Sequence, residues 1–553
     1  MPLRARMTRL RSLMPARSDL TSMLQAPRRD LVAGVTVAIV ALPLALGFGI
    51  SSGLGAAAGL VTAIVAGAVA AAFGGSNLQV SGPTGAMTVV LVPIVVAYGP
   101  GGVLTVGLLA GLLLILLALA SAGRYMRYVP APVVEGFTVG IAAVIALQQL
   151  PAALGVPTPH GENVALGAAK AVGDFAGHPN WTAVVIAVGV AALMLVGSRW
   201  RPSVPFSLVA VALATLVGHF AQLQVTRIGA LPANLPAPSL DFLDLSALTT
   251  LAPSAVAVAA LAALESLLSA TVADGMSVGE RHDPDRELFG QGLANIVTPL
   301  FGGVPATAAI ARTAVNVRAG ARSRLAALTH ALVLAAIVFT AAPLVAMIPI
   351  AALAGVLLAT AVRMVEVGSV RALLRSTRSD ALVLVLTAAT TLALDLVTAV
   401  ILGLVAAGGL ALRTIAATVT FEEVPLDHGQ HAEEERALLA EHIVAYRLDG
   451  PLFFAAAHRF LLELAEVTDV KVVILRLSRI STIDATGALV LHDVVERLEH
   501  RGITVLISGI KPGHERVLDT LGVADRLRDR RQVFATTPEA IEHARTLLPP
   551  AHH

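Results

Sequence analysis

A carboxyl group and a hydroxyl group lie one helical turn apart inside one of the long apolar runs of this sequence. Glu265 falls close to the middle of the run 252–274, and Ser269 follows it on the same helical face. An acid at membrane depth costs about 2.5 to 3.5 kcal/mol on insertion scales, so it is a functional candidate by default. Because a carboxyl group taken out of water favours its protonated form, the pair predicts a site that couples to a proton. The alternatives are a site that couples to sodium and a structural acid that only holds neighbouring helices together.

A repeated phrase precedes two short apolar runs. FGG occurs at 73–75 and at 301–303, and each copy is followed by small residues and a proline. The next runs, 84–97 and 306–317, would be roughly 21 Å and 18 Å long as helices, against a hydrocarbon core of about 30 Å. We therefore expect two half-helices that begin near the bilayer midplane. Each would follow extended chain, whose backbone only protein or a water-filled cavity can satisfy.

Two half-helices that face one another favour an anion between them. Each N-terminus offers free N–H groups and about half a positive charge, and small residues let a ligand approach. Arg312 lies about one turn from the amides of Ala309 and Ile310 and adds a full charge if it points inward; the alternatives are that it snorkels to the surface or pairs with a carboxylate. With Glu265 protonated, the site suits a dianion, which predicts joint binding of anion and proton. The predicted anion-binding residues are Ala45, Ser81, Thr84, Gly85, Ala308, Ala309, Ile310 and Arg312.

Other polar residues have simpler interpretations. The hydroxyl groups of Ser81 and Thr84 can donate to substrate oxygens, or they can only cap the broken helices. Glu135 begins an apolar run and is expected to act in gating or packing rather than as a ligand. Three residues near the ends of runs are expected at the membrane interface: His219, His330 and Asp395. No group of histidines or carboxylates has metal-site spacing, so no metal or cofactor is expected.

Composition places the chain in the membrane. Of its 553 residues, 56% are hydrophobic and 14% are charged, and the mean hydropathy is +0.79. These values are far outside the range of a soluble domain and indicate a polytopic membrane protein. The absence of cysteine excludes disulfides and thiol chemistry. No nucleophile or phosphate-binding motif predicts an enzyme, and the arginines are scattered at helix ends rather than gathered to bind nucleic acid.

Fourteen membrane segments are predicted, in two halves of seven. The FGG copies are 228 residues apart (301 minus 73), and because seven is odd the second half must be inverted relative to the first. This is the architecture of transporters with inverted repeats and broken helices. Arginines in alternate loops place both termini in the cytoplasm. The expected segments are 31–50, 54–73, 84–97, 101–121, 133–150, 182–198, 204–222, 252–274, 288–301, 306–317, 325–343, 345–362, 380–395 and 397–417.

A separate soluble domain is expected after the last segment. From about Phe421 the sequence becomes acidic and polar. KVVILRL and ITVLISG then predict buried parallel strands, and TGALVLHDVVERLEHRG predicts an amphipathic crossover helix between them that ends at Gly502. This is a βαβ unit. The expected organisation is a basic cytoplasmic N-terminus (1–26), a transmembrane domain (27–420), a linker (421–439), the soluble domain (440–548) and a tail (549–553).

Several stretches resemble one family. FGG…SGPTGAM, LESLLSATVADG, GQGLANIVTPLFGGVPATAAIARTAVNVRAGARS and STIDATGA are together similar to the SulP family of anion transporters, over about residues 27 to 547. The resemblance implies a core bundle that moves against a gate bundle, a homodimer, a multi-pass protein of the bacterial inner membrane type, and a cytoplasmic C-terminal STAS domain. It also implies an anion held between segments 3 and 10, with the acid at Glu265 linked to cation coupling.

Two positions depart from the family pattern. Leu44 follows Pro43 where members often have a polar residue, so one expected contact is missing. Ala485 stands where related bacterial regulators carry a phosphorylated serine, so phosphoregulation in that manner is not expected. Thr486 could still cap the following helix.

The predicted function is a secondary active anion transporter that works by alternating access and is coupled to protons through Glu265. ALPLALGFG and VSGPTGAMTVV are similar to bicarbonate-transporting members, whereas TAAIARTAVNVRAGA is closer to dicarboxylate- or sulfate-transporting ones. The substrate is therefore open among bicarbonate, sulfate and C4-dicarboxylates. A sodium-coupled symporter and an anion exchanger are the alternatives. A nucleobase carrier would need paired carboxylates and aromatic groups at the site. A membrane scaffold or sensor would not need half-helices. A channel could share the same site.

Overall fold

The computed structural model describes residues 12–157, 164–201, 204–232, 234–277, 281–394, 396–417, 420–424, 442–453, 470–523 and 531–548. The chain divides into two units, Met1–Val405 and Ala406–His553. Each unit has a hydrophobic core of its own. The predicted linker at 421–439 lies mostly outside the described residues, and the interfacial prediction for Asp395 lies wholly outside them.

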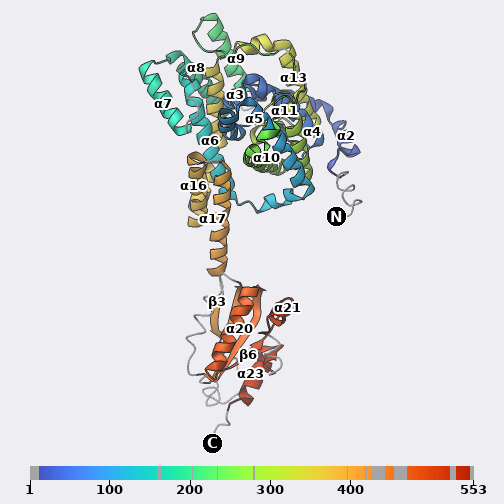
Figure 1. Cartoon of the computed structure of the whole chain (residues 1–553), viewed down its shortest axis with the longest axis vertical. Coiled ribbons are helices and arrows are strands. Elements are labelled where there is room, and N and C mark those ends of the chain that lie inside the picture. Colours follow the sequence, from blue (N-terminus) through green and yellow to red (C-terminus); the bar gives the residue numbers. More distant parts are fainter. Residues whose placement is uncertain are drawn as a thin grey trace. The chain divides into compact units, whose positions relative to one another are not determined.

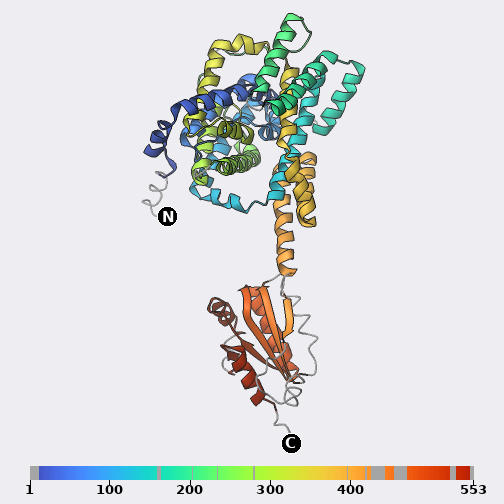
Figure 2. The ribbon, with the colours of Figure 1, turned by 180° about the vertical axis from the view of Figure 1, so that it is seen from behind.

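The first unit is helical, and its last helix continues past Val405 to Ala417. Figures 1 and 2 show this unit from opposite sides. Every apolar run predicted from the sequence corresponds to a helix or to part of one. Among the described residues, nine helices are long and apolar enough to cross a membrane. The arrangement as seven plus seven stays a prediction. The elements are α2 (Arg17–Met23), α3 (Pro27–Ser51), α4 (Ala56–Phe73), α5 (Gly85–Leu119), α6 (Ala131–Leu154), α7 (Val164–Gly177), α8 (Trp181–Trp200), α9 (Phe206–Phe220), α10 (Leu248–Met276), α11 (Pro284–Leu300), α12 (Ile310–Arg318), α13 (Leu325–Ala346), α14 (Ile350–Met364), α15 (Val367–Ser376), α16 (Arg378–Ala393) and α17 (Leu396–Ala417).

Three helices of the first unit are not predicted by the sequence: α2, which has 7 residues, and the helices α7 and α15. The last two have 14 and 10 residues, and few of these are buried. Both are amphipathic, with apolar residues on one face only, so neither contains an apolar run of the length that indicates a membrane segment.

Both half-helices are present: α5 begins at Gly85, one residue after the predicted start at 84, whereas α12 begins at Ile310, four residues after the predicted start at 306. α12 has nine residues, and α5 is broken at Gly99, whose φ of 68° and ψ of −175° are not helical. Extended chain precedes each of them, as β1 (Ser81–Gly82) and β2 (Thr307–Ala308). The two strands pair antiparallel, with Ser81 opposite Ala308. This pairing gives the extended backbone hydrogen-bond partners at a depth where water cannot supply them.

The paired strands β1 and β2 are called the crossing below. Small residues bring the helices around the crossing close together. A Cβ atom on Gly290 of α11 would collide with the backbone of Gly74, which follows α4. A Cβ atom on Gly59 would collide with the carbonyl oxygen of Ala45 on α3. Such close approach is the usual way in which membrane helices gain packing energy, because lipid offers no hydrophobic driving force between them.

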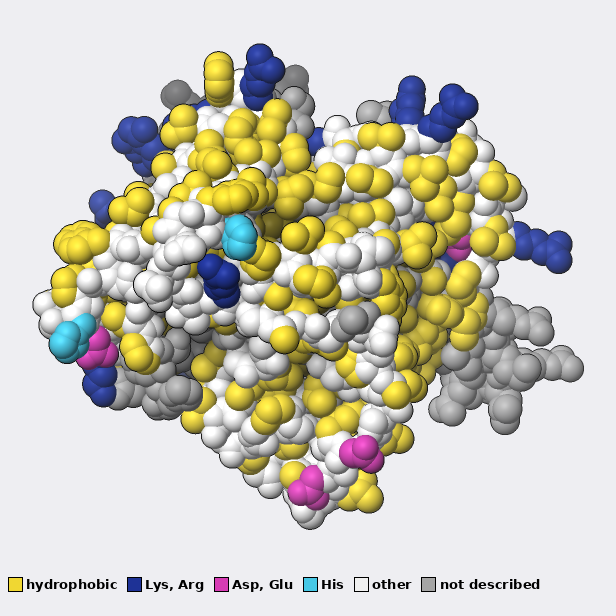
Figure 3. All heavy atoms as spheres, turned by 90° about the horizontal axis from the view of Figure 1, so that it is seen from above, with side chains coloured by type: hydrophobic (Ala, Val, Ile, Leu, Met, Phe, Trp, Pro, Cys, Tyr) yellow, Lys and Arg dark blue, Asp and Glu magenta, His cyan; other side chains and the backbone are white. Residues whose placement is uncertain are grey.

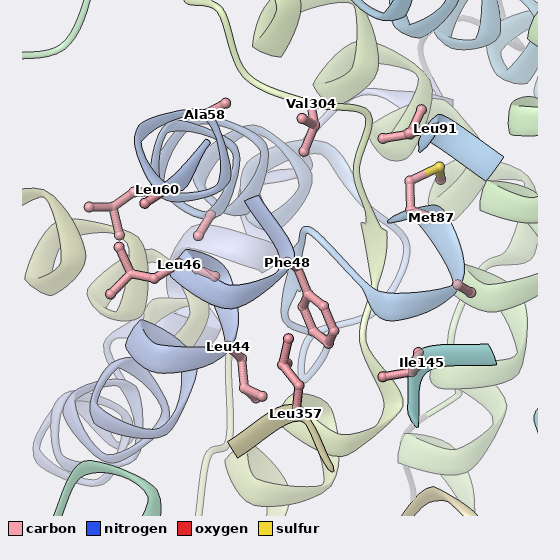
Figure 4. Close-up of a cluster of buried hydrophobic side chains, with 14 of the residues drawn as sticks. Leu44, Leu46, Phe48, Ala58, Leu60, Met87, Leu91, Ile145, Val304 and Leu357 are labelled. Atoms are coloured by element: carbon pink, nitrogen blue, oxygen red, sulfur yellow. The ribbon is translucent and has the colours of Figure 1, made fainter. Parts of the chain in front are cut away.

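Apolar side chains fill the space beside the start of α5. Figure 4 shows Phe48 of α3 pointing toward Leu357 of α14 and Ile145 of α6. A Cβ atom on Gly85 would lie closer than van der Waals contact to Ile145 and 3.1 Å from the ring of Phe48. The N-terminus of α5 is therefore packed against apolar groups on this side.

The outer surface of the first unit is also apolar. Figure 3 shows hydrophobic side chains over much of one face, with few acidic side chains among them. Exposed leucines and valines of this kind suit helices that face lipid. Examples are Val185, Val196, Leu332, Leu344 and Leu382.

The second unit contains a five-stranded sheet in the order β3-β4-β5-β6-β7. β3 pairs antiparallel with β4, and the other neighbouring strands are parallel. The predicted βαβ unit is confirmed as β5, α20 and β6, and Gly502 follows the helix with a φ of 80°. The elements are β3 (Thr420–Val424), β4 (Ile443–Leu452), β5 (Val472–Ile483), α20 (Ala485–His500), β6 (Thr504–Ser508), α21 (Pro512–Thr520), β7 (Val533–Phe534) and α23 (Thr537–Thr546).

The predicted capping role of Thr486 is wrong. α20 begins one residue earlier, at Ala485, and its N-cap is Asp484. The Asp484 carboxylate accepts a hydrogen bond from the N–H of Gly487 at 2.7 Å. An aspartate directly before a helix is as good a cap as a threonine, and here it precedes Thr486 in the chain.

Candidate functional site

The antiparallel crossing of β1 and β2 brings the starts of α5 and α12 together. The N-caps of the two helices are Thr84 and Ala309. The first N–H groups with a helical acceptor are those of Thr88, at 3.2 Å from the Thr84 oxygen, and Thr313, at 2.9 Å from the Ala309 oxygen. Of the amides before them, that of Met87 donates to the Thr84 hydroxyl, and the others have no backbone acceptor within their own helix. Two helix ends with partial positive charge therefore meet in the interior of the first unit.

Polar side chains of α10 and α11 hold the crossing from the sides. Gln291 donates to the hydroxyl of Ser81 at 2.6 Å. Asn295 makes two hydrogen bonds to the backbone of Ala306, at 2.9 Å to its oxygen and 2.8 Å from its nitrogen. The hydroxyls of Ser266 and Thr307 lie 3.0 Å apart. All these residues are buried, so the crossing is fixed by hydrogen bonds that water does not weaken.

Glu265 of α10 faces the start of α5. The Thr84 hydroxyl donates to the Glu265 carboxyl group at 2.8 Å, and the same hydroxyl accepts from the N–H of Met87 at 3.4 Å. Thr84 thus caps its helix, which is one of its two predicted roles, and its hydroxyl hydrogen is donated to Glu265. Donation to a substrate oxygen stays a prediction. Glu265 is half-buried, while its neighbour Ser266 is fully buried.

Ser269 faces a different helix. Its hydroxyl donates to the hydroxyl of Thr313 on α12 at 3.0 Å, and Thr313 also accepts from the N–H of Val80 at 3.1 Å. Glu265 and Ser269 share one face of α10, but Glu265 contacts α5 and Ser269 contacts α12. α10 therefore joins both half-helices.

Arg312 points inward. It is 1% exposed, and its Nη2 group donates to the carbonyl oxygen of Pro83. Its Nη1 group has no hydrogen-bond partner within the described ranges, and it lies against Gly82 of β1. Snorkelling to the surface is therefore excluded. Pairing with a carboxylate is not seen among the ion pairs of the described residues.

The remaining predicted anion-binding residues differ in whether their backbone N–H groups are free to bind a ligand. The N–H of Ala308 donates to Ser266 at 3.2 Å, and the N–H of Ala309 donates to the oxygen of Val80 at 3.0 Å. Both amides are thus used within the protein, which leaves the amides of Ile310 to Arg312, before the first helical bond at Thr313, for a ligand. Ile310 itself is 38% exposed.

Two predicted residues pack rather than present a polar group. Gly85 lies against Ile145 and Phe48, and Ala45 is 0% exposed with its carbonyl oxygen against Gly59. Leu44, beside Ala45, is buried in the apolar cluster of Figure 4.

The interfacial prediction for His330 is wrong. The side chain is 0% exposed. The prediction placed His330 near a membrane surface because the apolar run starts at Leu325. The two residues before that run, Ser323 and Arg324, are themselves buried at 0% and 2% exposure, so α13 begins inside the protein. His219, in contrast, is exposed at the end of α9, as expected.

Several buried polar residues that are not predicted from the sequence also support the site. Glu287 accepts hydrogen bonds from the N–H groups of Gly75 at 2.8 Å and Ser76 at 3.2 Å, and so fixes the first FGG loop. Polar residues four apart in an apolar run were the available signal for Gln291 and Asn295. Glu135 accepts from Ser369 at 2.7 Å, a packing contact consistent with its predicted role. In the ranges described above, no group of three or more His, Cys, Asp or Glu side chains could hold a metal ion.

A helical membrane unit whose two broken helices meet at a polar crossing, joined to a domain with a βαβ unit, is the architecture of a multi-pass membrane transporter with a cytoplasmic STAS domain. Residues 28–387 match the Sulfate permease family, and residues 437–540 match the STAS domain. The chain belongs to the sulfate permease family, whose members are anion transporters rather than enzymes. The resemblance drawn from the sequence is confirmed.

Similar proteins cover most of the chain. YvdB of Bacillus subtilis is 34% identical over 516 residues, which are 91% of this chain and 95% of that protein. Bicarbonate transporter BicA of Synechocystis sp. is 31% identical over 537 residues, which are 92% of this chain and 91% of that protein. The solved structure of the murine Solute Carrier 26 family member A9 anion transporter covers 94% of this chain and 91% of that chain, with a TM-score of 0.80 and 16% identity. At that identity the similarity concerns the fold alone, and it confirms the predicted fold class.

Proposed function

We propose that this protein is a secondary active anion transporter that works by alternating access, with the anion bound between the N-termini of α5 and α12. The observation that carries the proposal is the pairing of Ser81 with Ala308, which brings two helix N-termini together beside Arg312. Free amides and helix dipoles favour an anion, and the guanidinium adds a full positive charge. The names of the family and of BicA support sulfate and bicarbonate as substrates, and C4-dicarboxylates are the third class to test.

Glu265 is the proposed coupling residue. Its carboxyl group accepts a hydrogen bond from Thr84, the N-cap of one of the two half-helices, and the residue as a whole is half-buried. A proton on Glu265 removes a negative charge beside the anion, so proton and anion favour each other's binding. With an ionised Glu265, the negative charge would oppose the anion instead. This is the physical basis of proton-coupled symport at the site.

Uptake into proteoliposomes tests the proposal. Labelled bicarbonate, sulfate and fumarate are offered with and without an inward proton gradient, to the wild type and to Glu265→Gln. We expect one anion to accumulate with the gradient, and the variant to lose the response to it. Glu366→Gln is the matched control, because Glu366 is an exposed acid next to α15.

The other outcomes identify the alternatives. Uptake that follows sodium rather than the gradient would assign sodium symport, and uptake that needs an anion inside would assign exchange. Uptake of none of the three anions by the wild type would contradict the proposed function. The homodimer implied by the family resemblance is part of the proposal, and its mass in detergent can be measured by light scattering.

A further inference from the structure

The helix α15 carries two arginines and two large apolar side chains on its exposed surface. Val367 is 70% exposed and Leu374 is 45% exposed. Arg371 and Arg375 are exposed as well, and neither forms an ion pair with a described residue. The helix therefore offers an apolar surface and a cationic surface, side by side, to whatever covers it.

The exposed side chains of α15 change in type around the helix. Val367 and Leu374 are seven residues apart, which places them on one line along a helix with about 3.6 residues per turn. Arg371 and Arg375 are four residues apart and form the next line. Beyond the arginines lie the small exposed residues, which are Gly368, Ala372 and Ser376. Apolar, basic and small residues thus follow one another in the order of the layers at a membrane surface: hydrocarbon, headgroups and water.

The remaining side of α15 packs on the protein. The Ser369 hydroxyl donates to the Glu135 carboxylate of α6 at 2.7 Å. Val370 and Leu373 are half-buried on the same side. Val370 also precedes Leu374 by one turn, so the apolar surface continues from the protein onto the exposed side of the helix.

The place of α15 in the chain puts it on the cytoplasmic side. The STAS domain is cytoplasmic and follows α17. Because α16 and α17 are the last two predicted membrane segments, the chain crosses twice between the start of α16 and the STAS domain. α15 ends at Ser376, two residues before α16 starts at Arg378. The helix is therefore next to the cytoplasmic leaflet, which is the leaflet whose anionic lipids attract basic segments.

The charge of this segment favours an anionic surface. From Arg363 to Asp380 there are four arginines and two acids, which gives a net charge of +2 (4 minus 2). The helix α7 is also short and amphipathic, with exposed apolar residues, but it carries Lys170 and Asp174, whose charges cancel. An excess of positive charge therefore distinguishes α15 from α7.

We infer that α15 lies on the cytoplasmic leaflet and binds the headgroups of anionic phospholipids through Arg371 and Arg375. Val367 and Leu374 enter the edge of the hydrocarbon layer, and the guanidinium groups reach the headgroup phosphates, which accept paired hydrogen bonds. An arginine near an anionic membrane surface raises affinity about fivefold. The inference concerns the membrane around the protein, so it does not depend on which anion is carried.

Spin labelling of the full-length protein in lipid nanodiscs tests the position of α15. The chain has no cysteine, so one introduced cysteine carries the only label. We expect a label at Leu374→Cys to be relaxed mainly by oxygen, which dissolves in the bilayer, and a label at Ala372→Cys mainly by a water-soluble nickel reagent. If the nickel reagent relaxes both labels, the inference is overturned. A Leu374→Cys label that neither reagent reaches would show that protein covers α15, which also overturns it.

Nanodiscs of phosphatidylcholine with increasing phosphatidylglycerol test the preference for anionic lipid. The depth of the label at Leu374→Cys is the readout, because it reports on α15 alone. We expect the label to lie deeper as the fraction of phosphatidylglycerol rises. Arg371→Gln combined with Arg375→Gln should require at least about tenfold more phosphatidylglycerol for the same depth.

Arg199→Gln combined with Arg201→Gln, measured with the same label, is the matched control. Both arginines are exposed at the end of α8, so this variant removes the same charge from another helix. We expect the control to respond to phosphatidylglycerol as the protein with both arginines of α15 does. A label depth that is the same in both lipids, or an equal loss of response in the two double variants, overturns the role of Arg371 and Arg375.

Discussion

The guanidinium of Arg312 occupies the space that a side chain on Gly82 would need. A Cβ atom at Gly82 would lie 2.5 Å from Nη1 of Arg312 and 3.3 Å from the Cα atom of Ala63 on α4. Gly82 also has a φ of 155°, which residues with a side chain rarely adopt. The inward position of the arginine therefore depends on a glycine in the first half of the chain, 230 residues away (312 minus 82).

Gly82→Ala is expected to displace Arg312 and to lower anion uptake more than tenfold. The added methyl group meets both the guanidinium and the α4 backbone, and the arginine tip is the part that can move. Initial rates in proteoliposomes measure the effect, after size-exclusion chromatography shows that the variant is folded. Gly167→Ala on α7 is the control, because a Cβ atom there meets nothing within 4 Å. Equal rates for the two variants would contradict the prediction.

Arg312→Gln is expected to weaken sulfate binding more than bicarbonate binding. A single positive charge interacts with a dianion about twice as strongly as with a monoanion at the same distance. We expect the apparent Kd for sulfate to rise at least about tenfold, because hydrogen bonds to charged groups contribute about 1.5 to 3 kcal/mol. The measured quantity is the ratio of the apparent Kd for sulfate to that for bicarbonate, each obtained by titrating Tm with the anion. Arg318→Gln removes the same charge from the exposed end of α12 and should leave the ratio unchanged; a proportional loss for both anions in Arg312→Gln would argue for a purely structural arginine.

Thr84→Val is expected to reduce gradient-driven uptake about tenfold, whereas Thr84→Ser should restore it to within about threefold. Valine removes the hydroxyl that donates to Glu265, and serine retains it. The comparison variant is Thr88→Val, because the Thr88 hydroxyl donates to the Gly85 oxygen of its own helix, at 2.7 Å. The ratio of initial rates with and without the proton gradient is the measured quantity. If Thr84→Val and Thr88→Val have the same ratio, the contact with Glu265 does not contribute to coupling.

The broken helices could be predicted from the sequence because their signal is local. The runs 84–97 and 306–317 are too short to span a bilayer, and small residues precede both. Glu265 and Arg312 were identified for a similar reason, since each is a charge inside an apolar run. The βαβ unit of the second domain follows equally from local patterns of strand and helix.

The partners of these residues could not be predicted, because they depend on contacts between distant parts of the chain. Nothing near Ser81 indicates that it pairs with Ala308 or accepts from Gln291. The burial of His330 depends on how far other parts of the protein cover α13. The hydropathy of the apolar run 325–343 does not determine this. The amides of Ala308 and Ala309 were expected to be free, yet Ser266 and Val80 accept their hydrogen bonds.

Asp19 connects helix α2 to the membrane helices. We expect it to make the free energy of unfolding depend on pH. Its carboxylate accepts hydrogen bonds from Arg286 of α11, and the Arg324 Nε atom lies 3.7 Å away. Partial burial raises the pKa of Asp19, but the hydrogen bonds from Arg286 and from the Ala16 amide, with the charge of Arg324, outweigh it, so the pKa lies below its ordinary value. Because the folded-state pKa is the lower one, the contribution to stability is fully present well above the unfolded value of about 3.9 and is lost as pH falls through the folded-state pKa.

Asp19→Asn should therefore lower Tm near pH 7, with a loss of roughly 2 kcal/mol for the hydrogen bonds between charged groups. The difference from the wild type should persist at about pH 5 and shrink as the pH falls toward 3, because protonation then removes the same charge from the wild type. Thermal unfolding of the full-length protein at several pH values measures it. Asp241→Asn, in an exposed loop, should show no comparable difference at any pH. A Tm difference for Asp19→Asn that is the same at pH 7 and pH 3 would show that Asp19 contributes through its shape and packing, and that its charge does not hold α2 against α11.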